Sequence, residues 1–442
     1  MVNVAVVVLG DIGRSPRMTY HALSLSNMPA VDKVHMVGYS ETKAHPLIAN
    51  NDKVDIHPIR VFPISMSRTK SLLLWPFISV AKVLYQIIQL MWILLFVCRN
   101  INYVLVQSPP AIPTVFALQI ICFLCRCKLI IDWHNLGYTL LQLSLSKSER
   151  HPIIRVAKWI ERVFGRCAYA HLFVTEAMKD YLSTQWNLKG TLKVFHDKAS
   201  PIFKNLQISE QIEFLEEFKQ NYLSDAKDEQ FLQMVIDNKK QRLNNTTSKQ
   251  KNVGDENLAS LIISSTSWTE DEDFSVLLRS IKDYEVDSQL KHRLLFIITG
   301  KGPKKDYYLE EIRKLNLQKC RVISVWLESR DYPLLLGSAD VGVSLHNSSS
   351  GIDLPMKVVD MFGCCLPVLA VNFKAINELV QHERNGLIFN DSKQLYSYLK
   401  RLFSTFNSSN NTLSQMKQSL IQDRKVNTWE SSWNSIVSPL IN

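Results

Sequence analysis

The strongest constraint on the fold is a repeated pattern of short apolar runs that alternate with longer amphipathic segments. In the first 200 residues these runs are VAVVVLG, KVHMVGY, YVLVQSP, KLIIDWHN, HLFVTEAM and KVFHDKA. Short runs of mostly β-branched or large apolar residues, bounded by polar turns, are typical of strands buried on both faces of a parallel sheet. The pattern predicts a doubly wound α/β domain, in which ligands bind outside the carboxyl ends of the strands.

A second series of the same kind follows a change in composition. Residues 206–257 are dense in charged and amide side chains, as in KKQRLNNTTSKQKNVGDEN, and then LASLIISSTSW, RLLFIITGKGP, CRVISVW, ADVGVSLH and LPVLAVN follow. A chain of 442 residues is also too long for one ordinary core. We therefore expect an N-terminal domain at 1–205, a charged linker or insertion at 206–257 with a helix in its first half, and a C-terminal domain at 258–442 that ends in helices.

Charge and cysteine content narrow the class of partner. The net charge of +10 favours anionic partners such as phosphates or an acidic membrane surface. Nucleic acid is not expected, because the sequence has no zinc-finger spacing, no aromatic RNA-binding signature and no uninterrupted basic helix. The eight cysteines, three of them crowded at Cys122, Cys125 and Cys127, do not resemble a disulfide framework, so we expect a reducing, cytosolic setting.

One segment is apolar enough to meet a membrane. Residues 72–98 read LLLWPFISVAKVLYQIIQLMWILLFVC, and a second apolar run follows at 114–127. The part from Val83 to Cys98 is shorter than the roughly 20 residues of a spanning helix, and a helix buried inside the protein is the alternative. Tryptophan, tyrosine and flanking basic residues favour the membrane interface. We predict membrane association through the N-terminal half, and whether 72–98 spans the bilayer or only embeds in it stays open.

The first strand ends in LGDIGRSPRM, a tight turn that leads into a helix near a Ser-Pro pair. Glycines let the backbone approach a ligand, and free helix amides with nearby arginines attract an anion. The spacing is not the dinucleotide G-x-G-x-x-G, so a nicotinamide or flavin cofactor is not supported. The alternative is that the glycines only shape the turn. The predicted acceptor-binding residues here are Gly10, Asp11, Gly13, Arg14 and Arg17.

A second polar strand end is IIDWHNLGY. Asp132 or His134 could remove a proton from an attacking sugar hydroxyl, and both are predicted catalytic residues. Trp133 could stack on a sugar ring, and Asn135 completes the predicted acceptor-binding set. The alternative is that the acid and the imidazole cap the following helix.

In the second domain, TGKGPKKDYY places Lys301 and Gly302 in a turn suited to a diphosphate. A solvated basic loop is the alternative, and the pattern lacks the complete P-loop motif. The loop and helix start in HNSSSGIDLPMKVVDMFG offer further amides, a cation and carboxylates for a nucleotide sugar. The donor-binding residues predicted in that stretch are Ser350, Gly351, Asp353, Leu354, Lys357 and Asp360.

Together, LGDIGRSPRM, DWHNLGY, VTEAM, DKASP and SSSGIDLPMKVVDMFG resemble the chitobiosyldiphosphodolichol β-mannosyltransferase family over residues 2 to about 391. The resemblance implies the GT-B architecture, with two doubly wound Rossmann-like domains facing a cleft. It also implies an inverting transfer of mannose from GDP-mannose to dolichyl-diphosphate-chitobiose in a β-1,4 linkage, at the cytosolic face of the endoplasmic reticulum membrane. This reaction is an early step of N-glycan precursor synthesis, and other mannosyltransferases of that membrane are implied partners.

Two departures from the family pattern shape these expectations. The chain opens on a strand instead of a membrane-spanning helix, so anchoring is expected to rest on residues 72–127 or on a partner. The paired glutamates of related GT-B enzymes correspond here to Ser350 and Val358, and Asp353, Lys357 and Asp360 are the expected substitutes. No cofactor is expected and no Asp-x-Asp motif points to a metal, although metal dependence stays open. The remaining alternatives are a catalytically silent subunit of a membrane glycosyltransferase complex and a transferase that uses UDP-GlcNAc.

Overall fold

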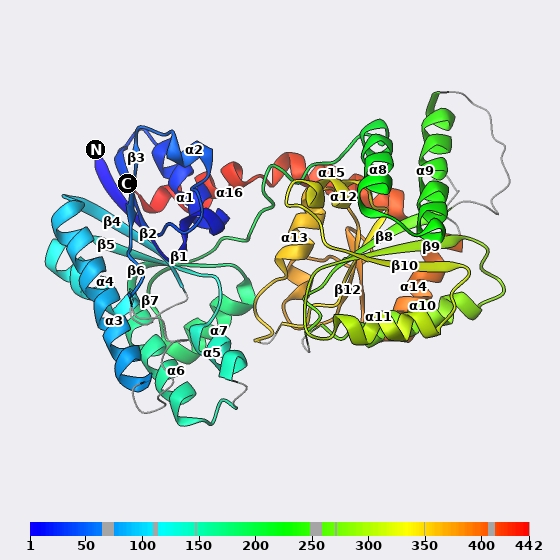
Figure 1. Cartoon of the computed structure of the whole chain (residues 1–442). Coiled ribbons are helices and arrows are strands. Elements are labelled where there is room, and N and C mark those ends of the chain that lie inside the picture. The colour runs from blue at the N-terminus through cyan, green and yellow to red at the C-terminus, as the bar shows by residue number, and fades with distance from the viewer. Residues whose placement is uncertain are drawn as a thin grey trace. The chain divides into compact units, whose positions relative to one another are not determined.

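The chain forms two compact α/β units in a computed structural model that describes residues 1–63, 75–108, 114–145, 148–247, 259–269, 272–348, 350–404 and 412–441 (Figure 1). Unit 1 comprises Met1–Asp197 and Trp429–Asn442, and unit 2 comprises Lys198–Thr428. Each unit is built around one parallel sheet. The two predicted doubly wound domains are therefore confirmed.

Unit 1 contains a seven-stranded sheet in the order β3-β2-β1-β4-β5-β6-β7. Its direction of winding reverses at β1, which lies between β2 and β4, so the switch point falls at the carboxyl end of β1. The strands are β1 (Val2–Asp11), β2 (Val31–Tyr39), β3 (Val54–Pro58), β4 (Ile101–Ser108), β5 (Lys128–Trp133), β6 (Cys167–Phe173) and β7 (Lys189–Val194). The short β3 was not predicted, because its sequence VDIHP lacks a continuous apolar run.

Helices cover both faces of the unit 1 sheet. Side chains of α1, α2 and α16 share a core with one face, and α4 packs on β4 and β5. The helices of this unit are α1 (Pro16–Ser26), α2 (Pro46–Ala49), α3 (Trp75–Trp92), α4 (Thr114–Cys125), α5 (Gly137–Leu145), α6 (Pro152–Gly165), α7 (Glu176–Trp186) and α16 (Trp429–Ile436), with the 3-10 turn η1 (Ile12–Arg14), the π-helical turn η3 (Ile93–Val97) and the C-terminal 3-10 turn η6 (Ser438–Leu440).

Unit 2 contains a six-stranded sheet in the order β10-β9-β8-β11-β12-β13, with its switch point at β8. The strands are β8 (Ala259–Ser265), β9 (Arg293–Thr299), β10 (Cys320–Val325), β11 (Val341–Ser344), β12 (Val368–Val371) and β13 (Gly386–Phe389). The helices are α8 (Ile208–Tyr222), α9 (Ala226–Thr247), α10 (Phe274–Val286), α11 (Lys305–Lys314), α12 (Asp331–Ser338), α13 (Met356–Gly363), α14 (Ser392–Ser404) and α15 (Thr412–Val426), with the 3-10 turn η5 (Ile376–Glu378).

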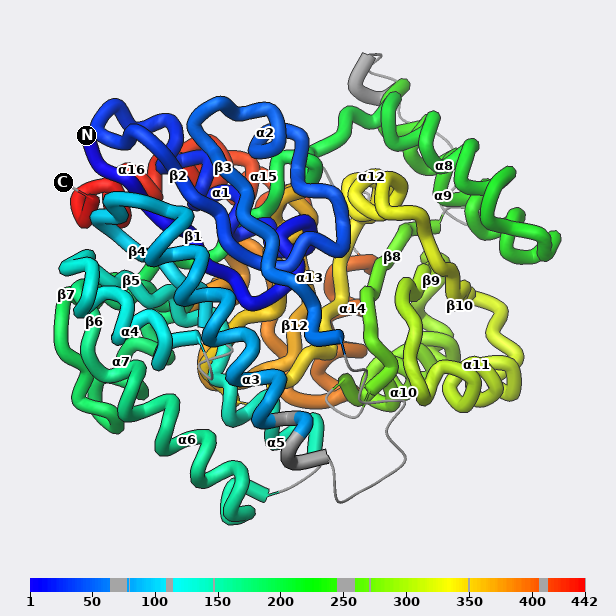
Figure 2. Tube along the Cα trace, turned by 60° about the vertical axis from the view of Figure 1, so that its left-hand side comes forward, coloured from blue at the N-terminus to red at the C-terminus, as the bar shows by residue number. Residues whose placement is uncertain are grey.

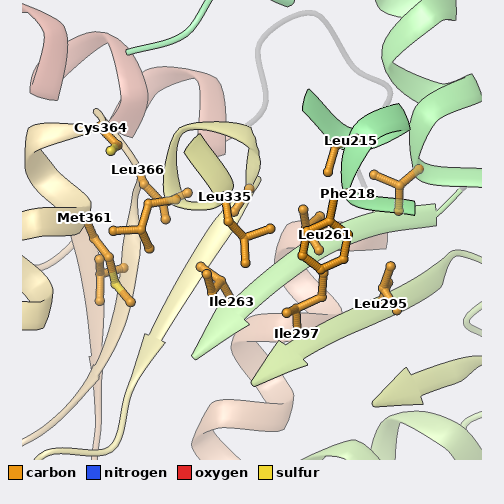
Figure 3. Close-up of a cluster of buried hydrophobic side chains, with 14 of the residues drawn as sticks. Leu215, Phe218, Leu261, Ile263, Leu295, Ile297, Leu335, Met361, Cys364 and Leu366 are labelled. Carbon is orange, nitrogen blue, oxygen red and sulfur yellow. The ribbon is translucent and has the colours of Figure 1, made fainter. Parts of the chain in front are cut away.

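Strand alternation divides the apolar residues of unit 2 between two cores. Leu261 and Ile263 of β8 pack with α8, α9, α12 and α13, whereas Ile262 between them packs with α10, α11 and α14 on the other face. Figure 3 shows Leu215 and Phe218 of α8 gathered with Leu261, Ile263 and the β9 side chains in the first of these cores. Continuous apolar runs thus mark strands that are covered on both faces, as the sequence pattern indicated.

Two predicted boundaries differ from the structure. The segment 206–257 is not a solvated linker up to residue 247, because α8 and α9 bury Phe218, Leu232 and Ile236 in the unit 2 core; residues 248–258 lie outside the described part. The predicted helix in the first half of this segment is confirmed. The C-terminal end also does not belong wholly to unit 2: Trp433 is 1% exposed and packs in the core of unit 1.

Candidate active site

At the switch point of unit 1, two carboxylates converge on one buried arginine. Arg17, on the first turn of α1, donates from Nε and Nη2 to Asp132 at 2.6 and 2.8 Å, and from Nη1 to Asp197 at 2.8 Å. It also donates to the carbonyl oxygen of Phe195 at 3.0 Å. Because this guanidinium is buried and each of its three nitrogens donates a hydrogen bond, it fixes the ends of β5 and β7 against α1.

The second carboxylate holds the candidate base. Oδ2 of Asp197 lies 3.4 Å from Nε2 of His134, whose side chain is 24% exposed. The other ring nitrogen, Nδ1, lies 3.4 Å from the side-chain Nδ2 of Asn135. A proton on Nε2 directed at Asp197 leaves Nδ1 as the proton acceptor. The site thus combines an orienting carboxylate with a partly exposed imidazole, which is the arrangement of a general base and its partner.

Burial and neighbouring charges shift the pKa of both groups. Burial, the largest effect, lowers the pKa of His134, but the hydrogen bond and the charge of Asp197 outweigh it, so the net pKa is raised above its usual value. Burial acts in the opposite sense on Asp197, yet the Arg17 charge and His134 hold the pKa of this carboxyl at about 2. Asp197 therefore stays ionised while His134 titrates.

Two sequence-based roles in this motif are wrong. Asp132 is fully buried, both of its oxygens are bonded to Arg17, and His21 Nε2 approaches Oδ2 at 3.3 Å, so it cannot accept a proton from a substrate. Trp133 is also fully buried and its Nε1 donates to His171 at 3.1 Å, so it cannot stack on a sugar. The alternation of strand residues explains both results, because Asp132 points toward α1 and Trp133 toward the opposite face, where it contacts Gly165.

The glycine turn after β1 has mainly a structural role in the described contacts. Asp11 accepts hydrogen bonds from the backbone and hydroxyl of Thr42 at 3.2 and 2.6 Å and thereby joins the ends of β1 and β2. A Cβ on Gly13 would lie 2.3 Å from the Thr42 hydroxyl, so this glycine is needed for close packing, whereas a Cβ on Gly10 would meet nothing closer than 3.6 Å. Of the predicted residues here, Arg14 presents an exposed cation, since 76% of its side chain is accessible.

In unit 2, a second ionic cluster lies at the carboxyl ends of β8 and β11. Nζ of Lys357, on the first turn of α13, bonds the carboxylate of Glu272 and lies 3.4 Å from the Ser267 hydroxyl. Glu272 is 3% exposed and also accepts from the Thr266 hydroxyl at 2.7 Å and from the Ser267 amide. His346, after β11, approaches the same carboxylate at 4.0 Å. Lys357 is thus held beside the carboxyl ends of the strands, the edge at which ligands bind in such sheets.

The serine-rich loop before α13 is closed by its own hydrogen bonds. Asp353 accepts from the hydroxyls of Ser348 and, at 2.8 Å, Ser350, and the Gly351 amide donates to Ser348 Oγ at 2.8 Å. Gly351 has φ +70°, a conformation that favours glycine. Asp353 therefore shapes this loop, and Leu354 follows it half-buried. Asp360 lies one turn after Lys357, where its charge, after burial, helps to raise the pKa of Tyr332.

The GKGP turn is built for close approach. A Cβ on Gly300 or Gly302 would lie 1.8 Å from the Thr266 carbonyl oxygen or 1.7 Å from that of Ser267, respectively, so the turn packs directly on the end of β8. Lys301 extends over the exposed ring of Trp326, with Nζ 4.1 Å from the ring centroid. Gly302 thus joins two strand-end loops, and Lys301 makes a cation–π contact.

Sequence reasoning missed two residues that organise these clusters. Asp197 lies in the DKASP motif, and its signal was a polar residue soon after a strand, the same signal that pointed to Asp132. Glu272 lies in TEDED, a run of acids typical of an exposed helix start, yet it is buried and bonded to Lys357, 85 residues away. Asp273 of the same stretch caps α10 through a bond to the Ser275 amide.

A group of potential metal ligands lies apart from the two ionic clusters described above. Within the described ranges, one group of three candidate ligands has its donor atoms within 4.8 Å of one another: His35 of β2, His57 of β3 and Cys98 after η3. Imidazole and thiolate are ligands suited to zinc. None of these residues is among the predicted site residues, so this group gives no support to a metal in the transfer site.

The apolar segment forms a largely exposed helix. Among the described residues, Val80–Val97 is long and apolar enough to cross a membrane, with mean hydropathy 1.9, yet only 17% of its residues are buried. Leu90 and Leu94 attach it to the protein, whereas Val80, Leu84, Ile88, Trp92 and Phe96 form an exposed stripe. The alternative of a fully buried helix is wrong for this part; residues 72–74 lie outside the described ranges.

Comparison with known proteins gives the family. Residues 260–405 match the family model described as glycosyl transferases group 1. A protein of Dictyostelium discoideum named chitobiosyldiphosphodolichol beta-mannosyltransferase is 53% identical, and the alignment covers 99% of this chain and 93% of the relative. The human protein of that name is 38% identical over 99% and 92% of the two chains, and an Arabidopsis thaliana protein named UDP-glycosyltransferase TURAN is 37% identical over 99% and 96%.

Solved structures agree on the fold. A crystal structure of Anabaena HepE in complex with UDP and glucose matches with a TM-score of 0.60 at 14% identity, covering 100% of this chain and 99% of the other. The glycosyltransferase WaaG matches with a TM-score of 0.56 at 12% identity, covering 98% of each. Both are GT-B proteins, and at this level of identity the likeness concerns the architecture. From the full-length relatives and the GT-B fold it follows that this chain belongs to the chitobiosyldiphosphodolichol beta-mannosyltransferase family and is a mannosyltransferase.

Proposed function

We propose that the chain transfers mannose from GDP-mannose to the distal sugar of dolichyl-diphosphate-chitobiose, with His134 as the general base. The observation that carries this assignment is the contact of His134 with Asp197, in which the imidazole is partly exposed and the carboxylate is ionised. The names of the full-length relatives support the acceptor.

In the proposed reaction, the 4-hydroxyl oxygen of the acceptor sugar attacks the anomeric carbon of mannose. The bond from that carbon to the phosphate oxygen breaks, GDP leaves with the electron pair, and His134 takes the hydroxyl proton. Attack from the face opposite the leaving group inverts the anomeric carbon, which gives the β linkage. Asp197 stabilises the imidazolium that forms, and Arg17 and Asp132 are positioning residues that keep Asp197 in place.

On unit 2, we propose that Lys357 neutralises the diphosphate of the donor. The Lys357 side chain is 31% exposed, and its Nζ is held by Glu272 near the end of β8. The amides at the start of α13 lie beside it. Asp360 is the remaining candidate for ribose or sugar hydroxyls. Arg14 is the acceptor-side cation that we assign from the first glycine turn.

The exposed stripe of Val80–Val97 supports a membrane location, which we propose to be the cytosolic face of the endoplasmic reticulum. An apolar stripe on a helix whose Leu90 and Leu94 are buried against the protein favours lying in the interface plane over spanning. Carbonate extraction of membranes that released all of the protein would exclude insertion but leave peripheral contact intact.

The test is a transfer assay with purified protein, GDP-mannose and a phytanyl-diphosphate chitobiose acceptor. UDP-GlcNAc serves as the competing donor, because one full-length relative is named a UDP-glycosyltransferase. We expect one mannose to be added and to be released by a β-mannosidase. Transfer from UDP-GlcNAc alone would overturn the donor assignment, and tight nucleotide binding without any transfer would instead support a silent subunit.

A further inference from the structure

Helix α6 presents an apolar and a basic surface side by side. Ile153, Val156 and Trp159 are 52%, 56% and 61% exposed. Arg155 and Arg162, which alternate with them along the helix, are exposed as well. Large apolar side chains are rarely exposed in series on a soluble helix, so this surface indicates a partner that is both apolar and anionic.

The basic side of α6 lines a cavity of about 810 Å³. Four cations face it, Arg150, Arg155, Lys158 and Arg162, and one carboxylate, Glu149, which bonds Lys158 at 2.5 Å. Among the residues that the structure describes, no carboxylate pairs with the three arginines. Exposed guanidinium groups that share a cavity without acidic partners are suited to bidentate binding of phosphate.

Helix α6 is joined to the segment that follows the end of β5, the strand end that carries His134. Glu161 of α6 accepts from the amides of Gly137 and Tyr138 at 2.8 and 3.1 Å, directly after the end of β5. Glu161 thus joins α6 to the chain that leaves the carboxyl end of β5. Arg155 and Arg162 of the cavity flank Glu161 along the helix, about 9 Å and about 1.5 Å away at 1.5 Å per residue.

Helix α4 lies beside α6 in unit 1 (Figure 2). Phe116 of α4 packs edge-on against Phe164 of α6 with ring centroids 4.8 Å apart, and Phe123 at the end of α4 is 84% exposed. Helix α3 and the turn η3, which together carry the exposed stripe from Val80 to Phe96, also contact α4. A lipid chain bound near the cavity would therefore have exposed apolar side chains of α6, α4 and α3 in the same unit.

We propose that this cavity binds the diphosphate of the polyprenyl-linked acceptor, with Arg155 and Arg162 on the phosphates and Trp159 against the first part of the lipid chain. The proposal rests on the acceptor assigned above. In that acceptor two sugar rings separate the phosphates from the reacting hydroxyl, which requires a phosphate site apart from the base. The cationic cavity on α6, which Glu161 joins to the segment after His134, meets this requirement.

The test compares the full-length wild type with the Arg155→Ala/Arg162→Ala double variant, and uses Arg279→Ala, an exposed arginine of α10, as a control for loss of surface charge. We expect the double variant to raise the KM for phytanyl-diphosphate chitobiose about tenfold or more, since charge-assisted bonds to phosphate are lost. The KM for GDP-mannose and the melting temperature should stay close to those of the wild type, because both side chains are exposed.

A binding measurement keeps this proposal separate from the transfer reaction. Equilibrium binding of phytanyl-diphosphate chitobiose is compared with that of the phytanyl chitobioside that lacks the diphosphate. Wild-type protein should prefer the diphosphate, and the double variant should lose that preference, even if no sugar is transferred. An unchanged preference in the variant would overturn the proposal. So would weaker sedimentation with phosphatidylserine vesicles at an unchanged acceptor KM, because the arginines would then bind lipid headgroups.

Discussion

The substitution Asp197→Asn tests the proposed base most directly. It removes the charge 3.4 Å from His134 while keeping a side chain of the same size. Two unit charges about 4 Å apart interact with about 4 kcal/mol at an effective dielectric constant of 20. Arg17 shares the Asp197 charge and His134 is partly solvated, so the interaction is weaker than this bound, and its loss should lower the pKa of His134.

The assay is the pH dependence of kcat/KM for the acceptor. A base must be unprotonated, so activity in the wild type should rise with pH through the raised pKa of His134. In Asp197→Asn this rise should move to lower pH, and the plateau should drop by roughly tenfold to a hundredfold because the imidazolium loses its partner. His134→Ala should reduce kcat/KM about 10²-fold to 10⁴-fold, and its activity should not show this rise with pH.

Stability provides the control for this experiment. Breaking a buried ion pair costs about 3 to 5 kcal/mol, so Asp132→Asn, which removes the bidentate partner of Arg17, should lower the melting temperature at least as much as Asp197→Asn. It should move the pH profile much less, because Asp132 is the weakest of the influences on His134. Equal shifts of the profile in both variants, or no shift in Asp197→Asn, would refute the base assignment.

Three further predictions concern other parts of the chain. Trp433→Ala should lower the free energy of unfolding in denaturant by about 3 to 5 kcal/mol, because this indole is 1% exposed in the unit 1 core; an unchanged free energy of unfolding would contradict that packing. Gly302→Ala should lower the melting temperature strongly, since its Cβ would lie 1.7 Å from a carbonyl oxygen, whereas Gly10→Ala should be tolerated. Lys357→Ala should weaken GDP binding about tenfold or more in calorimetry, with Glu272→Gln as a milder variant; equal GDP affinity would remove Lys357 from the donor site.

Much of the fold and of the site's location could be predicted from the sequence. Runs such as KLIIDWHN identify buried strands because a strand covered on both faces needs apolar residues at every position, and their polar ends mark the edge where ligands bind. The same reasoning pointed to Arg17, Asp132 and His134 as neighbours of a site before any contact was known. Length and composition likewise identified the helix that carries the exposed stripe from Val80 to Phe96.

The roles within the site were decided only by the tertiary structure. One residue of strand alternation separates Asp132, which turns toward Arg17, from Trp133, which turns into the opposite core, and the sequence pattern does not show which face is which. The pairing of His134 with Asp197, or of Lys357 with Glu272, joins residues far apart in the chain. Whether a carboxylate acts as a base, a partner or a cap depends on its burial and its charged neighbours, and these exist only once the strands and helices have packed together.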